Sequence, residues 1–178
     1  MRAVRVVSVT AVLALLALLV WDLAHSDRGN LASKVDKGQT VTAPALQLPR
    51  LGSAGDLSLA AYRGKVVVVN FWASWCVDCK LEAQALATAQ RRWQGKNVVF
   101  LGVDGQDLGS RALAYVHRYD VAYPVVRDGD GNAGKTWGVT GFPETFFVTP
   151  GGQVTPPHYS GPVTVADLNS AIEHALAS

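Results

Sequence analysis

Four consecutive valines, Val66 to Val69, continue into Asn70 and Phe71 and constrain the fold more than any other stretch of the chain. β-Branched residues favour strands, and an apolar run without polar alternation is typical of a strand that is covered on both faces. Strands of this kind lie in parallel or mixed sheets with helices packed on the two faces. The run therefore predicts the central strand of an α/β domain.

Strands and helices are expected to alternate along the rest of the domain. A small hairpin is predicted ahead of the valine run, where residues 45–48 and 57–59 alternate apolar with polar around a turn rich in Gly and Ser. The elements expected after the run are a helix over 76–93, a strand over 98–103, a helix over 110–119 with Ser110 as N-cap, a short strand over 123–126, a short helix over 131–137, a strand over 145–148, an edge strand over 154–159 and a final helix that starts at Thr164 and ends at Ala177. This order predicts an α/β sheet with helices on both faces.

An apolar segment precedes the domain. No charge interrupts Val6 to Trp21, while Arg2 and Arg5 precede the segment and Asp22 follows it. A membrane-spanning helix needs about 17 residues or more, so the segment is borderline unless Arg5 extends toward the headgroups. The alternatives to a membrane anchor are a cleaved signal peptide and a buried core helix. Basic residues at one end favour the anchor and the signal peptide over the core helix. An anchor or a signal peptide would place the rest of the chain outside the cytoplasm.

The sequence divides into three parts on this basis. Residues 1–21 are the expected anchor or signal peptide, 22–43 a polar linker, and 44–178 the folded domain. The chain has 16 basic and 14 acidic residues, and the loss of Arg2 and Arg5 with the leader makes the remainder formally neutral. No basic cluster favours nucleic acid, so no nucleic-acid partner is expected.

The two cysteines, Cys76 and Cys79, are expected to be working thiols. A disulfide across so short a loop would stabilise the fold little. The pair lies where the buried strand gives way to a helix, so Cys76 is placed at a helix N-terminus, which favours a thiolate. Cys79 lies within the first turn, close enough to form a disulfide with Cys76.

Two alternatives for the cysteines are an inert buried pair and half of a zinc site. Zinc normally needs four ligands, but the sequence has no second CxxC and its histidines are scattered at positions 25, 117, 158 and 174. Haem attachment needs a histidine after the second cysteine, where Lys80 stands. No metal or organic cofactor is expected.

Two motifs resemble membrane-tethered thioredoxin-like proteins of the TlpA, ResA and CcmG (DsbE) groups. The first runs from Gly64 through the valines to Trp72-Ala73-Ser74-Trp75-Cys76, and the second is Trp137-Gly138-Val139-Thr140-Gly141-Phe142-Pro143-Glu144-Thr145-Phe146. The likeness covers about residues 43–178. It implies a thioredoxin-like fold, in which a central mixed sheet is flanked by helices, with an N-terminal β-hairpin and a central insertion. This chain departs from the pattern at two positions: it has Asp78 and Gln84 where relatives commonly have proline.

The resemblance also implies roles for particular residues. Pro143 matches a cis-proline that faces the CxxC, and the backbone of Phe142 before it would pair with an incoming peptide. Glu82, three residues after Cys79 on a helix, matches an acid beneath the site; burial would raise its pKa and let it exchange a proton with Cys79. Glu144 matches a position beside the cis-proline, and Trp75 is expected to be exposed next to the site. The alternatives are that Glu82 and Glu144 are solvated surface residues and that Pro143 is an ordinary trans proline.

Three functions follow from these features. The first is a reductase for disulfides of exported proteins such as apocytochrome c, with the Cys76–Cys79 disulfide reduced again by a membrane electron donor of thiol–disulfide type. The second is an oxidant of exported proteins on the same fold. The third is a non-catalytic binding module such as a copper chaperone, although such chaperones use a CxxxC spacing. The first is the function that we expect.

Overall fold

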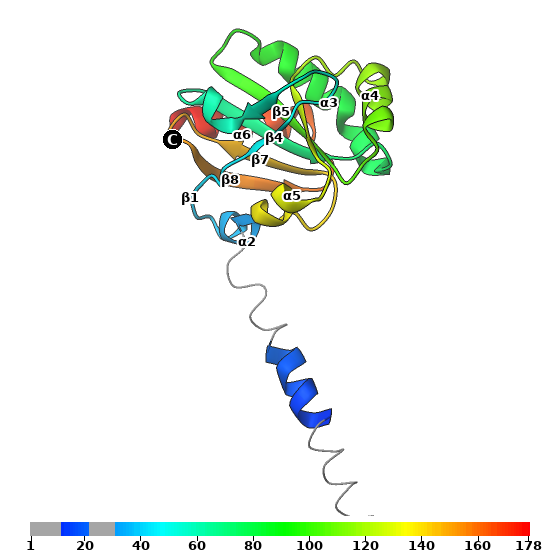
Figure 1. Ribbon diagram of the computed structural model, residues 1–178. Coiled ribbons are helices and arrows are strands. Elements are labelled where there is room, and N and C mark those ends of the chain that lie inside the picture. Colours follow the sequence, from blue (N-terminus) through cyan, green and yellow to red (C-terminus); the bar gives the residue numbers. More distant parts are fainter. Residues whose placement is uncertain (1–11, 22–30) are drawn as a thin grey trace, which may run out of the picture.

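The computed structural model of the 178-residue chain describes residues 12–21 and 31–178. A six-stranded sheet has the strand order β1-β8-β7-β4-β5-β6, and β2 and β3 form a separate two-stranded sheet (Figure 1). The strands are β1 (Val41–Thr42), β2 (Gln47–Pro49), β3 (Asp56–Ser58), β4 (Val66–Trp72), β5 (Val98–Gly105), β6 (Val125–Asp128), β7 (Glu144–Val148) and β8 (Gln153–Ser160). The helices are α2 (Leu31–Asp36), the short 3-10 helix η1 (Leu59–Tyr62), α3 (Val77–Trp93), α4 (Gly109–Arg118), α5 (Asn132–Trp137) and α6 (Val165–Ala177).

β4 lies in the middle of a mixed sheet, as the valine run predicts. It pairs in parallel with β5 and antiparallel with β7, and every one of its residues is buried. Successive side chains of a strand point to opposite faces. Val66 and Val68 accordingly join one apolar core, and Val67 and Val69 join the other. The prediction of a central mixed sheet is confirmed.

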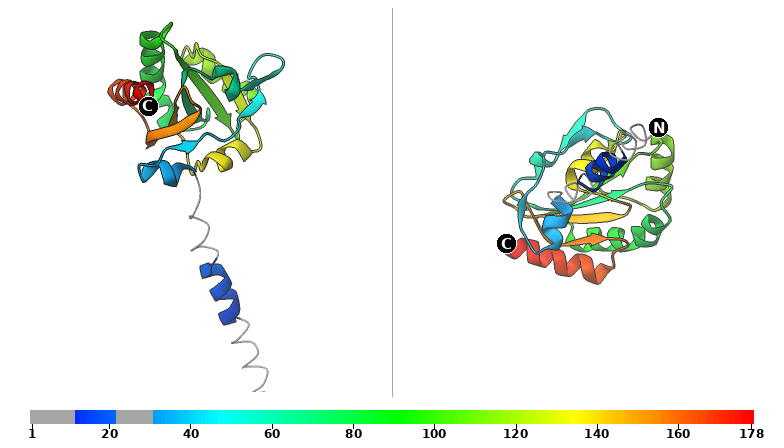
Figure 2. Two further views of the ribbon diagram at one scale, coloured as in Figure 1. Left: turned by 90° about the vertical axis from the view of Figure 1, so that its left-hand side faces the viewer. Right: turned by 90° about the horizontal axis from the view of Figure 1, so that it is seen from below.

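The two cores are covered by different elements. The first contains buried residues of α3, α4 and α6, and α3 packs on α6. The second contains residues of α2, α5 and the β2–β3 hairpin, and the turned views in Figure 2 show helices on both sides of the sheet. The hairpin is the one expected ahead of the valine run, and α4, β6 and α5 occupy the central region where an insertion is expected.

The folded region begins earlier than the predicted boundary at residue 44. Residues 31–42 were expected to be linker, but α2 buries Leu31, Ala32 and Val35 in the second core, and β1 pairs antiparallel with the start of β8. The apolar spacing in α2 spans little more than one helical turn, which is too short to stand out in a polar segment. Residues 22–30 of the predicted linker lie outside the described residues.

The start of α4 also differs from the prediction. α4 begins at Gly109 with Leu108 as N-cap, and no side chain caps it. Ser110 therefore lies inside the first turn, and its assignment as N-cap is wrong. The start predicted for the last helix at Thr164 is confirmed by a capping box, in which Thr164 Oγ1 accepts from Asp167 N and the Asp167 carboxylate accepts from Thr164 N.

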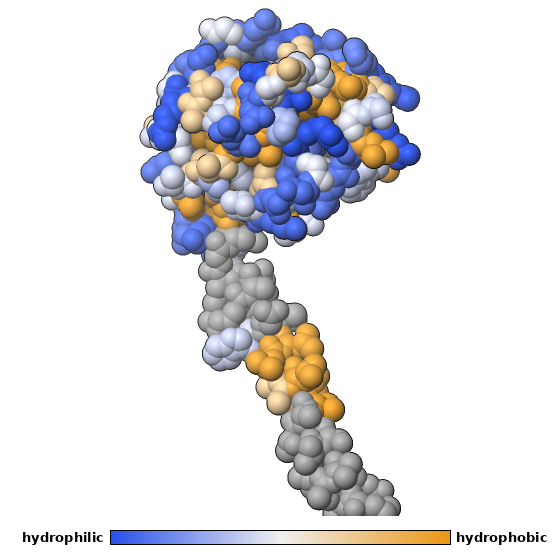
Figure 3. Space-filling view, viewed as in Figure 1, coloured by the Kyte–Doolittle hydropathy of each residue, from blue (hydrophilic) through white to orange (hydrophobic). Residues whose placement is uncertain are grey.

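The described part of the N-terminal leader is a helix over residues 12–21. Its large side chains, among them Leu13 and Leu16, are exposed. Figure 3 shows most of this helix as hydrophobic surface, in contrast to the mixed surface of the domain. Within residues 12–21 and 31–178, no helix combines the length and the apolar character needed to cross a membrane. Residues 1–11 of the predicted anchor or signal peptide lie outside the described residues.

Candidate active site

Cys76 and Cys79 form a disulfide at the junction of β4 and α3. Cys76 is the N-cap of α3, and its Sγ accepts a hydrogen bond of 3.0 Å from Cys79 N. Cys76 is 5% exposed, whereas Cys79 is fully buried. A sulfur at a helix N-terminus is surrounded by free N–H groups that favour its anionic form. Cys76 is therefore the sulfur that an outside partner reaches first.

The loop between β4 and α3 is held by contacts from the segment that joins β5 to α4 and from α4 itself. Ser74 N donates to Asp107 Oδ2 at 2.6 Å, and the Trp72 ring stacks on Tyr115 with centroids 4.3 Å apart. The hydroxyl of Tyr115 in turn donates to the Cys79 carbonyl at 2.7 Å. These bonds fix the backbone on both sides of Cys76, so the sulfur has a defined position.

The segment that faces this loop contains a cis peptide bond between Phe142 and Pro143, as the resemblance implies. Pro143 is buried, and the Phe142 ring lies 5.6 Å from that of Trp75. A Cβ at Gly105 would overlap the Phe142 ring, so only glycine fits at the end of β5. Trp75 is 54% exposed, as expected, and forms the outer edge of the site.

Glu82 is buried in the first core, on the same side of α3 as Cys79. Its side chain accepts hydrogen bonds from Asn70 Nδ2 at 2.8 Å and from Val163 N at 3.1 Å. Burial disfavours the charged form and outweighs these two bonds, so the pKa of Glu82 rises to about 7. The carboxyl can thus take up or release a proton near neutral pH.

Glu144 is buried to the same degree at the start of β7 but has a different environment. Oε1 accepts from Thr140 N at 2.7 Å, Thr140 Oγ1 at 3.0 Å and Gly141 N at 3.1 Å, while Oε2 lies 3.0 Å from His158 Nε2. Burial alone would raise the pKa of Glu144, but these hydrogen bonds and the His158 charge lower it. Glu144 therefore ties the segment before Pro143 to β8.

Comparisons with known proteins find relatives that match over much of the chain. Residues 40–156 match the model of the AhpC/TSA family. The chain belongs to the AhpC/TSA family. The thiol:disulfide interchange protein DsbE of Escherichia coli K12 is 32% identical over 160 residues, which cover 86% of this chain and 80% of that protein. The protein of the same name from Pseudomonas fluorescens biotype C is 38% identical over 106 residues, but this match covers 59% of this chain and only 57% of the relative's own length.

A solved structure of another protein has the same fold as this chain. A thiol:disulfide interchange protein of the thioredoxin family from Chlorobium tepidum TLS superimposes with a TM-score of 0.68 at 25% identity, over 78% of this chain and 97% of that one. The predicted thioredoxin-like fold and the predicted oxidoreductase family are therefore confirmed.

The structure of this AhpC/TSA member places Glu82 on the same side of α3 as Cys79 and the Phe142 ring beside Trp75. The Glu144 carboxyl instead faces His158 of β8 and the loop at Thr140, and no contact joins it to the sulfurs among the described residues.

The structure also adds residues that the sequence did not reveal. Asn70 Nδ2 bridges Glu82 and Thr145 Oγ1. A polar residue inside a buried valine strand was the available signal for Asn70. Tyr115, Asp107 and His158 carried no such signal, because their contacts join segments far apart in the sequence.

A further buried acid lies near the loop. Asp104, next to Trp72 in the β4–β5 register, has a pKa raised to about 7 by burial and by the charge of Asp107, which Arg127 offsets only in part. Among the described residues, no group of three or more His, Cys, Asp or Glu side chains is arranged to hold a metal ion.

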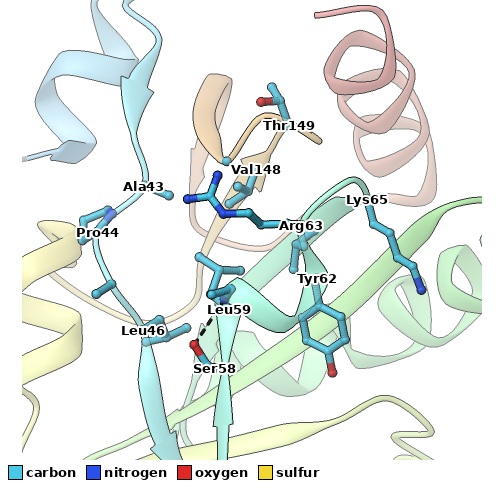
Figure 4. A pocket seen from close by; sticks show the side chains of 14 residues that line it. Ala43, Pro44, Leu46, Ser58, Leu59, Tyr62, Arg63, Lys65, Val148 and Thr149 are labelled. Carbon is cyan, nitrogen blue, oxygen red and sulfur yellow. Dashed lines mark hydrogen bonds between the residues drawn. The ribbon is translucent and has the colours of Figure 1, made fainter.

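The hollow in Figure 4 is separate from this site. It holds about 220 Å³ and is lined by the segment before β2, by η1 and by the start of β4, including Leu46, Leu59 and Arg63. The disulfide follows the other end of β4, so this hollow lies at the opposite end of the sheet. It has no contact with the sulfurs.

Proposed function

We propose that this chain is a thiol–disulfide oxidoreductase that works outside the cytoplasm and reduces disulfides of exported proteins, apocytochrome c among them. The observation that carries the proposal is a disulfide with one sulfur at a helix N-terminus and the other buried on the side of α3 that holds Glu82. The names of the DsbE relatives support the same reaction class. We further propose that residues 1–21 anchor the chain in the membrane, with the catalytic domain outside.

The first step uses the accessible sulfur. In the reduced protein, the Cys76 thiolate attacks one sulfur of the partner's disulfide. The partner's S–S bond breaks, a mixed disulfide to Cys76 forms, and the first partner thiolate leaves and takes up a proton. Phe142 offers its backbone to the partner's chain beside the cis bond, and Trp75 and Pro143 provide apolar contact.

The second step uses the buried sulfur. Cys79 gives its proton to the Glu82 carboxylate, and the resulting thiolate attacks Cys76 Sγ. The mixed disulfide breaks, the second partner thiolate leaves and takes the proton that Glu82 holds, and the Cys76–Cys79 disulfide forms. Two electrons and two protons have then moved to the partner: the proton of Cys79 passes through Glu82, and the proton that Cys76 lost to water when its thiolate formed is matched by the one that the first partner thiolate takes from water. A dithiol donor in the membrane returns them to the protein.

Variants of the two cysteines in the full-length protein test this proposal. Cys79→Ser is expected to accumulate mixed disulfides through Cys76, detected as adducts that dithiothreitol releases. Cys76→Ser is expected to lose turnover of protein disulfides altogether. Full turnover by Cys76→Ser would refute the mechanism.

The direction and the compartment need their own measurements. Equilibration with glutathione buffers gives the reduction potential, and a value near that of a strong periplasmic oxidant, about −120 mV, would reverse the direction that we propose. A thiol reagent that does not cross membranes should label Cys76 in intact reduced cells. Labelling only after lysis would contradict the location outside the cytoplasm.

A further inference from the structure

A second hollow, of about 370 Å³, opens beside the redox loop between α3 and α4. Ser74 and Trp75 border it at the loop, Lys80 lines it from α3, and residues of α4 line it from the other side. Trp75 directly precedes Cys76 in the chain, and Ser74 precedes Trp75. A group bound in this hollow therefore contacts the loop that carries the reacting sulfur.

Three cations line the hollow, and no acid does. They are Lys80, Arg111 and Arg118. Within the part of the chain that the structure describes, no carboxylate lies within ion-pair distance of any of the three; the ion pairs there involve Arg127 and His158. The domain has equal numbers of basic and acidic residues, so this concentration is local. Like charges around one hollow repel each other, and an anion placed between them would relieve that repulsion.

The helical period of α4 explains how the hollow forms. Residues three, four and seven apart lie on one face of a helix, so Arg111, Ala114 and Arg118 line up. The small side chain of Ala114 leaves space between the two arginines. Tyr115, beside them, turns inward to stack on Trp72 and to donate to the Cys79 carbonyl. The wall of the hollow is thus bonded directly to the redox centre.

The spacing of the cations fits an extended segment. Seven helical residues span about 10 Å, so Arg111 and Arg118 leave the backbone of α4 about that far apart and spread the positive charge along the hollow. The same distance equals about three residues of extended peptide. Trp75, which lines the hollow and is 54% exposed, adds the apolar contact that protein interfaces use.

We propose that this hollow, here called the cationic groove (Lys80, Arg111, Ala114 and Arg118 with Trp75 and Tyr119), binds an acidic segment of the protein whose disulfide is reduced. Carboxylates on an extended segment would contact the two arginines and Lys80 while a neighbouring disulfide lies at Cys76. The inference rests on the proposed function and adds a preference among its partners. It selects protein disulfides that are flanked by Asp or Glu.

Matched peptides test the preference with the full-length protein. Three peptides carry the same intramolecular disulfide and differ only in flanking residues, which are Asp/Glu, Ser/Asn or Lys. We expect kcat/KM at low salt to be about tenfold higher for the acidic peptide than for the lysine peptide. The ratio should approach one at 1 M salt, where charges are screened beyond about 3 Å.

A charge-reversal pair tests the residues. Arg111→Glu/Arg118→Glu should abolish or invert the acidic preference, and Arg111→Gln/Arg118→Gln should remove it with less disturbance of α4. The control Arg91→Glu/Arg92→Glu makes the same change in net charge in the last turn of α3, where both residues are exposed, and should keep the preference.

Each outcome decides one question. Equal kcat/KM for the acidic and lysine peptides, or equal loss of preference in the control and in the groove variants, would overturn the cationic groove. Turnover of the Ser/Asn peptide by the unmodified protein tests the proposed function separately. If the Ser/Asn peptide is reduced and the acidic and lysine peptides have equal kcat/KM, the proposed function stands and the cationic groove does not.

Discussion

Glu82 and Glu144 are the same side chain at the same depth, each 1% exposed, yet their pKa values move in opposite directions. Glu82, on α3, accepts two hydrogen bonds from uncharged donors. Glu144, on β7, accepts three from one loop and faces His158, whose own pKa is raised, against the effect of burial, by its bonds to Glu144 and Asp36. An equal exposed fraction therefore does not give two carboxyls the same pKa, because the number and charge of the donors around each one also contribute.

The difference separates two tasks within one site. A carboxyl that titrates near pH 7 can exchange a proton during catalysis, which suits Glu82. A carboxylate that stays ionised holds its donors in place, which suits Glu144 beside the cis-proline segment. The contrast can be tested by changing each acid in the same way.

The largest effect is expected from Glu144→Ala. The change leaves three donors and His158 without their acceptor in a buried site, which typically costs about 3–5 kcal/mol of unfolding free energy. Glu82→Ala strands fewer and uncharged donors, for about 1–3 kcal/mol. Urea unfolding at pH 7.5 measures both, and equal losses would remove the distinction.

The pH dependence of stability should also differ in sign. The folded protein holds the Glu82 proton more tightly than the unfolded chain, so this contribution is present below the ordinary pKa of 4.5 and is lost as pH rises to about 7. The interval corresponds to about 3 kcal/mol. Glu144, with a lowered pKa, contributes stability at neutral pH that is lost as pH falls through its folded pKa.

Unfolding curves between pH 3 and 8 measure these two contributions. Glu82→Gln should remove the decrease in stability between acidic and neutral pH, and Glu144→Gln should remove the loss at low pH. A Glu82→Gln protein with the pH dependence of the unmodified protein would show that Glu82 does not titrate near pH 7.

A smaller effect is expected on the rate of exchange. Glu82→Gln removes the proton acceptor of Cys79 and should slow disulfide formation by up to about 10²-fold, with loss of the inflection near pH 7. Glu144→Gln should keep the inflection. Stopped-flow fluorescence of Trp75, which lies beside the disulfide, follows the reaction, and an unchanged Glu82→Gln profile would exclude proton transfer to Glu82.

The smallest effect is expected from Asp36→Asn. Asp36 lies 2.9 Å from His158 Nδ1, but its side chain is 55% exposed, so the pair contributes at most about 1 kcal/mol. The variant should lower the pKa of His158, which an NMR titration of the ring measures. Asp120→Asn, an exposed acid after α4, is the control and should leave the His158 pKa unchanged.

The two acids also show what the sequence could predict. Glu82 was predictable because its relation to Cys79 is local, three residues along one helix, and β4 and α3 follow equally from local patterns. The partners of Glu144 were not predictable, because His158 reaches it from β8 and Asp36 reaches His158 from α2. α2 itself was assigned to the linker, since its three buried side chains give no extended period. Contacts between distant segments depend on the complete packing and leave little trace in either segment alone.

The strand order of the sheet affects how the protein is made. β1 lies at the sheet edge next to β8, and β4 needs β7 on one side. A chain that emerges N-terminus first presents β1, β4 and the CxxC segment before β7, β8 and the Val163 backbone that bonds Glu82. During this interval Cys79 lacks the contacts that later bury it, and Glu82 lacks one of its two hydrogen-bond donors. The environment that raises the pKa of Glu82 is therefore complete only when the C-terminal part of the chain has joined the fold.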